Sequence, residues 1–292
     1  MIAINGVLTE SLAKWQPGTT EMTRRVDPWP AAAFAGLIGS PLPPPGLGDA
    51  LPPLWHWFTL LDYPTLENTG ADGHPLEGPF LPAIRGRRRM FAGGRLQLER
   101  PILIGADLTS RSRVTEVSVK QGRSGEMAFV TVRQELSADG VAVGVEEQDI
   151  VYRSAREGSE PAAAPRPSAD QPVPEGQWRL EVPTRPVLLF RFSALTYNGH
   201  RIHYDRPYTT EIEGYPDLVI HGPLLALLAL ELPRVHAPRE FVHEFQYRLV
   251  RPAFSPTRIV ATGRPRPDDG TAEVIVGAAG AAPSLTGRVV LG

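Results

Sequence analysis

Alternating apolar and polar positions dominate two parts of the chain, and each part predicts a set of β-strands. In the first half the alternation covers four runs separated by turn-forming residues, which predicts an antiparallel meander. These runs are RMFAGGRLQLERP, DLTSRSRVTEVSVKQGR, GEMAFVTVRQELSADG and VAVGVEEQDIVYR, at residues 89–101, 107–123, 125–140 and 141–153. Comparable runs in the second half occupy residues 240–252, 257–267, 271–279 and 284–292.

Helical patterns precede both sets of strands. The segment Trp29 to Leu37 predicts a short helix, and Pro223 to Leu232 predicts a helix whose apolar face is nearly continuous. The apolar run Val187 to Phe192 is interpreted as a strand. Because a helix followed by strands occurs twice, we predict a duplicated α+β unit in which each sheet wraps around a helix.

The boundary between the two units is a segment rich in Pro, Ala, Ser and charged residues, and it has the composition of a linker. A chain of 292 residues also exceeds the usual size of a single core. We therefore predict an N-terminal repeat at 1–154, a linker at 155–177 and a C-terminal repeat at 178–292. Two Pro- and Gly-rich tracts, 40–55 and 72–82, predict long ordered loops within the first repeat.

Charge and composition exclude several classes of protein. A net charge of −2 provides no electrostatic surface for nucleic acid or an anionic membrane, and the absence of cysteine excludes disulfides and thiolate chemistry. The longest apolar run, 224–230, is too short to span a bilayer, and the N-terminus lacks the pattern of a signal peptide. We therefore expect a cytoplasmic protein with a small-molecule partner. Lysine occurs only at Lys14 and Lys120, so each arginine is weaker evidence for specific recognition than usual.

Candidate chemistry is concentrated in LTYNGHRIHYD, residues 195–205, because five of the seven histidines lie between positions 200 and 243. Three interpretations are open. The pair His200 and His203 can be ordinary loop residues, or they can join His221 as metal ligands, although no nearby carboxylate or thiol completes a zinc set. The third interpretation is acid–base chemistry beside the helix start at Gly222, where unpaired N–H groups can stabilise negative charge.

A family resemblance becomes specific at these residues. The segments FSALTYNGHRIHYD and GYPDLVIHGPL resemble the active-site region of MaoC-type enoyl-CoA hydratases and dehydratases, whose motif is G-D-x-N-P-x-H. They are most similar to the branch with mesaconyl-CoA and itaconyl-CoA hydratases and fungal mitochondrial hydroxyacyl-thioester dehydratases. RRMFAGGRLQLERPILIGADL and KQGRSGEMAFVTVRQE are similar to the non-catalytic N-terminal repeat of that branch. The resemblance implies an α+β double hot-dog fold with one active site in the C-terminal repeat.

The resemblance also implies roles for individual residues. The motif aligns Asn198 with the family's aspartate, His200 with its asparagine, Arg201 with its proline and His203 with its catalytic histidine. Because an amide cannot accept a proton as a carboxylate does, His203 is expected to be the base, with Asn198 holding the water. The backbone N–H of Gly222 is the expected oxyanion donor.

The remaining candidates concern substrate binding. His200 and His221 are expected either to line the pocket or to pack, whereas Arg201 and Arg206 are predicted to bind a free carboxylate of the substrate. The arginines at 85–89 either meet CoA phosphates or form a solvated start to a strand. His56 and His74 lie in Pro-rich loops, and we predict that the N-terminal repeat carries no catalytic group.

Together these observations predict a hydro-lyase that acts on a short branched enoyl-CoA, of the C5 dicarboxylic mesaconyl or itaconyl type. One alternative is a 3-hydroxyacyl-thioester dehydratase of fatty-acid synthesis, and another is a non-catalytic acyl-CoA-binding protein. We expect no metal and no cofactor other than the CoA thioester as substrate. A homodimer is left open.

Overall fold

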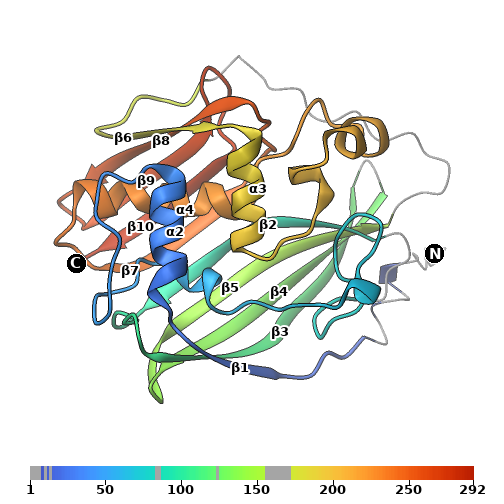
Figure 1. The fold of residues 1–292 in the computed structure, drawn as a ribbon, viewed down its shortest axis with the longest axis horizontal. Coiled ribbons are helices and arrows are strands. Elements are labelled where there is room, and N and C mark those ends of the chain that lie inside the picture. Colours follow the sequence, from blue (N-terminus) through green and yellow to red (C-terminus); the bar gives the residue numbers. More distant parts are fainter. Residues whose placement is uncertain (1–7, 10–11, 13–14, 83–86, 123–124, 155–171) are drawn as a thin grey trace.

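The structure is a computed structural model that describes residues 8–9, 12, 15–82, 87–122, 125–154 and 172–292 (Figure 1). Its main feature is one ten-stranded antiparallel sheet with the order β1-β3-β4-β5-β2-β7-β10-β9-β8-β6. The strands are β1 (Thr20–Arg25), β2 (Arg87–Leu98), β3 (Asp107–Gly122), β4 (Gly125–Ala138), β5 (Val141–Ser154), β6 (Trp178–Thr184), β7 (Val242–Leu249), β8 (Thr257–Arg266), β9 (Thr271–Ala278) and β10 (Leu285–Leu291).

The strand order shows the predicted duplication. The first five strands run β1-β3-β4-β5-β2 across the sheet, and the second five repeat this order as β6-β8-β9-β10-β7. Strands β2 and β7 pair from Gly93 with Arg248 to Gln97 with Glu244, so the halves form a continuous sheet. The two predicted sheets therefore join edge to edge, because β2 of the first half hydrogen-bonds to β7 of the second.

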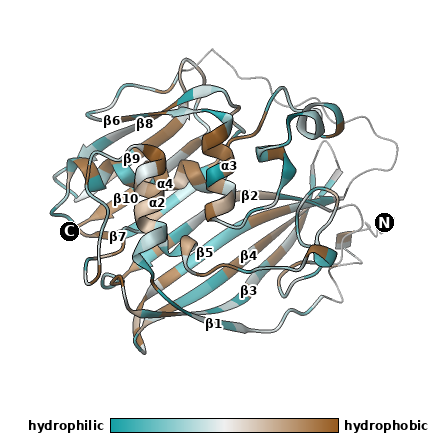
Figure 2. Ribbon diagram, viewed as in Figure 1, coloured by the Kyte–Doolittle hydropathy of each residue, from teal (hydrophilic) through white to brown (hydrophobic). Residues whose placement is uncertain are grey.

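The predicted meander needs correction. Strands β3, β4 and β5 form a meander, but β2 pairs with β5 and not with β3, which follows it in sequence. Two edge strands, β1 and β6, were missed because their alternation covers only six and seven residues. Figure 2 shows that the long strands of the first half carry both hydrophobic and hydrophilic stretches, as expected for a sheet with two different faces.

Helix α2 (Pro28–Ile38) confirms the first predicted helix, and its sequence explains both ends. The N–H of Trp29 donates to Asp27 Oδ1 at 2.7 Å, proline opens the first turn, and Gly39 ends the helix in a left-handed conformation. Four side chains spaced at helical intervals face the core: Ala31, Phe34, Ala35 and Ile38.

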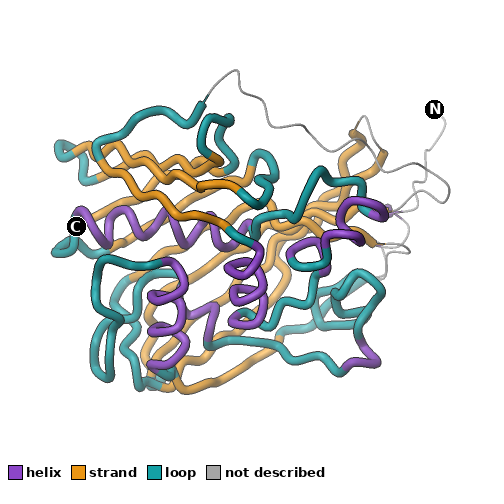
Figure 3. Tube along the Cα trace, turned by 45° about the horizontal axis from the view of Figure 1, so that its top comes forward, coloured by secondary structure: helices purple, strands orange, loops and turns teal. Residues whose placement is uncertain are grey.

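Helix α3 (Pro186–Leu195) replaces the strand predicted at Val187 to Phe192. Proline favours the first turn of a helix, and the buried side chains repeat with helical spacing at Leu188, Leu189 and Phe192. The apolar run was too short to distinguish a strand from a half-buried helix. Helices α2 and α3 pack side by side on the sheet (Figure 3).

Helix α4 (Gly222–His236) is the long central helix of the second half, and it confirms and extends the helix predicted at Pro223 to Leu232. It contacts strands of the second half, which curve around it, as well as β2. The described part of the first half has no equivalent long helix; the short 3-10 helices η1 (Trp55–Phe58) and η2 (Leu66–Asn68) lie between α2 and β2. The prediction that each sheet wraps its own helix is therefore confirmed only for the second half.

One apolar core joins the two halves. It contains α4, the buried faces of α2 and α3 and residues from strands of both repeats. A smaller cluster lies under the first half, around Val130, Ile150 and Tyr152. None of the helices described here is long and apolar enough to cross a membrane. Most of the predicted linker, residues 155–171, lies outside the described residues, and the predicted domain boundaries stay a prediction.

Candidate active site

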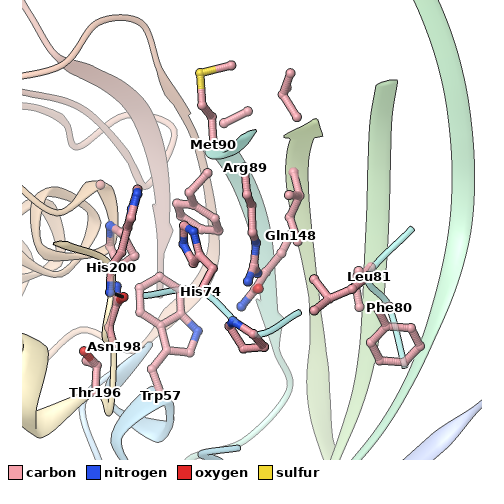
Figure 4. Close-up of a pocket in the computed structure, with 18 of the residues that line it drawn as sticks. Trp57, His74, Phe80, Leu81, Arg89, Met90, Gln148, Thr196, Asn198 and His200 are labelled. Carbon is pink, nitrogen blue, oxygen red and sulfur yellow. Dashed lines mark hydrogen bonds between the residues drawn. The ribbon is translucent and has the colours of Figure 1, made fainter. Parts of the chain in front are cut away.

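A cleft of about 1940 Å³ lies between the two halves, and both of them supply its lining. Figure 4 shows side chains of the first half, including His74, Arg89 and Gln148, facing Thr196, Asn198 and His200 of the second half. The volume is ample for a thioester with a large carrier group. The segment that the sequence singled out therefore forms one wall of this cleft.

His203 lies in this wall, on the 3-10 helix η3 (Arg201–His203), and its side chain is buried, with 7% of the residue exposed. The ring Nδ1–H donates to the carbonyl of Val219 at 2.7 Å. A carbonyl can only accept, so this bond fixes the tautomer and leaves Nε2 with a free lone pair. Burial lowers the pKa of His203 to about 4, opposed by the Val219 hydrogen bond and aided by the charge of His74. A neutral imidazole at neutral pH is suited to act as a base.

The ring of His221 packs against the ring of His203. Their rings stack with centroids 3.6 Å apart, and Ser193 Oγ lies 2.9 Å from His221 Nε2, within hydrogen-bond distance. His221 is fully buried and is not among the residues that line the cleft. Burial, followed by the charges of His203 and His200, holds the pKa of His221 well below its usual value. Of the two roles expected for His221, lining or packing, the geometry favours packing.

Asn198 and His200 form the turn that leads into His203. The backbone N–H of His200 donates to Asn198 Oδ1 at 3.0 Å, which leaves the Asn198 Nδ2 donors available to the cleft that this residue lines. His200 also lines the cleft, and burial, with the neighbouring charges of His74, His203 and Arg89, lowers its pKa. Both residues are therefore placed to contact a bound molecule.

His74 reaches this wall from the first half, which the sequence did not predict. Its ring stacks on His200 with centroids 3.9 Å apart, and its Nδ1 lies 3.1 Å from Asp72 Oδ2. Burial raises the pKa of Asp72, but its hydrogen bonds with His74 outweigh this effect, so the net shift is downward. The loop is held in place because the N–H of Arg201 donates to the carbonyl of Asp72 at 2.8 Å. Nothing in the local sequence of a Pro- and Gly-rich loop indicates this long-range contact.

Asp72, His74 and His200 are also the described residues best placed to hold a metal ion, with ligand atoms within 4.8 Å of one another. This trio differs from the histidine set weighed on sequence grounds. The two imidazole rings lie over one another, with centroids 3.9 Å apart and planes tilted by 35°. Since the lone pair of an imidazole nitrogen lies in the ring plane, stacked rings do not converge readily on one ion at the usual ~2.0–2.1 Å.

Gly222 begins helix α4 and lines the cleft close to His203, with His221 as the capping residue. The first N–H groups of a helix have no intrahelical partner and lie at the positive end of its dipole. The absence of a side chain matters here, since a Cβ on residue 222 would lie 2.5 Å from Leu249 Cδ1. The position thus offers a backbone donor without steric obstruction.

Arg201 and Arg206 lie outside the lining of the cleft. Arg201 forms a two-pronged contact with Asp205 Oδ2, at 2.9 and 2.7 Å, and its guanidinium stacks on Tyr208. Arg206 contacts Asp217 Oδ1 at 3.0 Å. Their predicted role in binding a substrate carboxylate stays a prediction, and these contacts give it no support.

The structure describes only part of the arginine cluster at 85–89, because residues 85 and 86 and the side chain of residue 87 lie outside the described residues. Arg88 and Arg89 both line the cleft, and Arg88 Nη1 lies 3.5 Å from Glu213 Oε2. His56, the other histidine of the first half, is buried and lies 2.5 Å from Glu146 Oε2. This contact places His56 in a polar cluster on the first half of the sheet.

The fold is a double hot-dog, and its candidate site places the buried His203 beside the start of helix α4. The family model "Hydroxyacyl-thioester dehydratase type 2" matches residues 54–255, and the chain belongs to this family. The chain is 45% identical over 240 residues to a mesaconyl-C(4)-CoA hydratase of Chloroflexus aurantiacus, covering 82% of this chain and 83% of the relative.

Solved structures support the fold. A MaoC-like dehydratase from Phytophthora capsici has a TM-score of 0.65 at 15% identity, covering 95% of this chain and 96% of that one. A Mycobacterium tuberculosis protein described as a double hotdog fold has a TM-score of 0.56 at 13% identity, covering 97% and 98%. These structures confirm the predicted double hot-dog fold, whereas the family model and the 45% identical relative confirm the predicted family and the assignment as a hydro-lyase.

Proposed function

We propose that this protein hydrates the 2,3 double bond of a short branched enoyl-CoA of the C5 dicarboxylic type, or catalyses the reverse dehydration. The observation that carries the proposal is the tautomer of His203: its Nδ1–H is committed to Val219, so Nε2 is a free base at the wall of the cleft. The similarity to a mesaconyl-C(4)-CoA hydratase supports the choice of acyl group.

In the hydration direction, His203 Nε2 takes a proton from water while the water oxygen bonds to the β-carbon. Asn198 Nδ2 donates to this water and orients it, since Asn198 Oδ1 is held by the His200 N–H. Electron density moves from the double bond to the thioester oxygen, and the N–H of Gly222 stabilises the charge that develops there. The imidazolium of His203 then returns its proton to the α-carbon.

The burial of His203 has a cost and a benefit in this mechanism. Its lowered pKa makes the imidazole a weaker base, but it also keeps the residue neutral throughout the physiological range. The substrate is the source of the CoA group, and the proposed reaction requires no metal and no further cofactor. The proposal includes the expected cytoplasmic location and leaves the formation of a homodimer open. The contacts described above bear on neither point.

The test is a parallel assay with mesaconyl-CoA, crotonyl-CoA and octenoyl-CoA, in which hydration is measured as the loss of the conjugated-thioester absorbance. We expect a C5 dicarboxylic thioester to have a higher kcat/KM than octenoyl-CoA. The family match favours a second candidate, a 3-hydroxyacyl-thioester dehydratase, and a preference for octenoyl-CoA would establish it in place of the first. Binding without turnover of any member would instead indicate a non-catalytic acyl-CoA-binding protein.

A further inference from the structure

A dicarboxylic acyl thioester brings one free carboxylate into the cleft. In a mesaconyl C4-thioester this carboxylate is attached to the β-carbon, which is the atom that water attacks. An unpaired carboxylate is costly to remove from water, so the cleft needs a cation beside the water-activating histidine. Arg201 and Arg206 do not supply it, because they are paired with Asp205 and Asp217 away from the lining.

Two other arginines of the lining are already paired with carboxylates. Arg95 contacts Glu147 at 2.8 Å and Asp149 at 3.0 Å, and Arg88 lies 3.5 Å from Glu213. Arg89 differs from both, because no hydrogen bond or ion pair joins its side chain to any residue that the structure describes. Its guanidinium is therefore free to form a bidentate pair with an incoming carboxylate.

Arg89 faces the wall that carries His200 from the other side of the cleft. It lies on β2 opposite Tyr152 of β5, and Figure 4 shows its side chain extending into the cavity between His74 and Gln148. Its positive charge contributes to the lowered pKa of His200, as expected for a guanidinium close to that ring. The charge of Arg89 thus reaches the histidine wall.

We propose that Arg89 binds the free carboxylate of the substrate and selects dicarboxylic over monocarboxylic enoyl thioesters. This inference rests on the proposed hydratase function. It assigns specificity to the first half of the chain and catalysis to the second, so a productive complex requires both walls of the cleft. It also replaces Arg201 and Arg206 with a residue that no single motif in the sequence distinguished from its neighbours.

The test compares kcat/KM for mesaconyl-CoA and crotonyl-CoA in wild type, Arg89→Gln, Arg89→Lys and the control Arg111→Gln, an exposed strand arginine outside the lining. Arg89→Gln is expected to lower the value for mesaconyl-CoA by about 10- to 100-fold, as for loss of a charge-assisted pair, and to change crotonyl-CoA by less than about threefold. Arg89→Lys should recover part of the loss, since it restores the charge without the planar fork. Arg111→Gln should resemble wild type.

Two outcomes would overturn the inference. An equal loss for both substrates would mean that Arg89 binds the CoA portion or supports the fold. A carboxylate-selective loss in Arg251→Gln instead of Arg89→Gln would assign the role to Arg251, which also lines the cleft and whose Nε lacks a hydrogen-bond partner among the described residues.

A binding measurement separates this inference from the proposed function. Titration calorimetry with two saturated thioesters, methylsuccinyl-CoA and butyryl-CoA, needs no turnover. Arg89→Gln should weaken only the dicarboxylic ligand. If this selective weakening occurs in a protein that hydrates none of the enoyl thioesters, the proposed function is wrong and the Arg89 site stands. If hydration occurs normally and the selective weakening does not, the Arg89 assignment is wrong.

Discussion

The protonation state of His203 is the residue-scale property that governs the proposed reaction. Only the neutral imidazole can take a proton from water, and the neutral form predominates above the pKa, which burial lowers to about 4. An unperturbed histidine, with a pKa of ~6.5, would lose activity through the range below neutrality. The site therefore tolerates mild acid.

We predict that kcat/KM of the wild type stays level from pH 7 down to about pH 5 and falls only below this range. Asn198→Asp should move the fall to higher pH, because a nearby carboxylate favours the imidazolium and raises the histidine pKa. His203→Ala should lose about 10²–10⁴-fold at every pH. The measurement is a pH profile of the three proteins, and full activity in His203→Ala would refute the assignment of the base.

His74 tests the prediction that the first half carries no catalytic group. Its contacts with Asp72 and His200 are consistent with a packing role in the cleft wall. We predict that His74→Ala lowers kcat/KM by less than about tenfold, whereas a true general base is worth about 10²–10⁴-fold. Asp72→Asn is a second variant for this test, because it removes the carboxylate that contacts His74. A loss in His74→Ala as large as that in His203→Ala would place a catalytic group in the first half.

The candidate residues that could be selected from the sequence share one continuous segment or begin a helix. His203, Asn198 and Gly222 meet this condition, and the structure brings them to one wall of the cleft. His74 and Arg89 do not, because their positions depend on a loop and a strand that meet the histidine segment only after folding. Arg201 and Arg206 are close to His203 in sequence, but they contact the local carboxylates of Asp205 and Asp217, so their predicted role stays a prediction.

At the scale of elements, the start of α4 sets the position of the proposed oxyanion donor. Gly222 lies against Leu249 of β7, and a Cβ at residue 222 would meet the end of that side chain at 2.5 Å. The neighbouring Phe91 ring would be 3.6 Å away, which is an ordinary contact. A side chain at 222 must therefore displace either Leu249 or the first turn of the helix.

We predict that Gly222→Ala lowers kcat by roughly tenfold with little change in KM, because a shifted N–H weakens an interaction made mainly in the transition state. Leu249→Ala, which makes room for the new methyl group, should recover most of this loss in the double variant. Steady-state kinetics of the four proteins in the cycle provide the measurement. Equal losses in Gly222→Ala and in the double variant would contradict the steric explanation.

Pattern length determined which elements could be predicted. The strands from β2 to β5 and from β7 to β9 are eight or more residues long, and α4 has ten consecutive buried residues, so each of these elements covers a long stretch of sequence. Helix α3 is short and apolar, which makes its pattern ambiguous. The proline at its first turn was the signal that favoured a helix over a strand.

For the whole molecule, duplication was predictable from the repeated order of elements, but the join between the halves was not. The two repeats have the same strand order because they have the same pattern. Their pairing through β2 and β7 depends on two edges that become adjacent only in the folded chain. Since the cleft takes one wall from each half, this join also determines the geometry of the active site.

Gly93 lies in the β2–β7 pairing at a position where a side chain would not fit. It pairs with Arg248, has φ of 152°, and a Cβ there would lie 2.4 Å from the carbonyl oxygen of Tyr247. The obstructing atom belongs to the backbone of β7, so it cannot move without separating the strands. Gly36, within α2, is a matched control because a Cβ there would meet nothing within 4 Å.

We predict that Gly93→Ala lowers Tm by roughly 5–10 °C and reduces kcat/KM even at temperatures where the protein stays folded, because it disturbs the join that sets the spacing of the two walls. This shift corresponds to a loss of about 2–3 kcal/mol in a chain of this size. Gly36→Ala should leave Tm unchanged or raise it by a few degrees, since alanine favours a helix over glycine by about 1 kcal/mol. Thermal melts and assays of both variants at low temperature provide the measurement. A Gly93→Ala protein with wild-type stability and activity would show that the β2–β7 pairing is not needed to hold the cleft together.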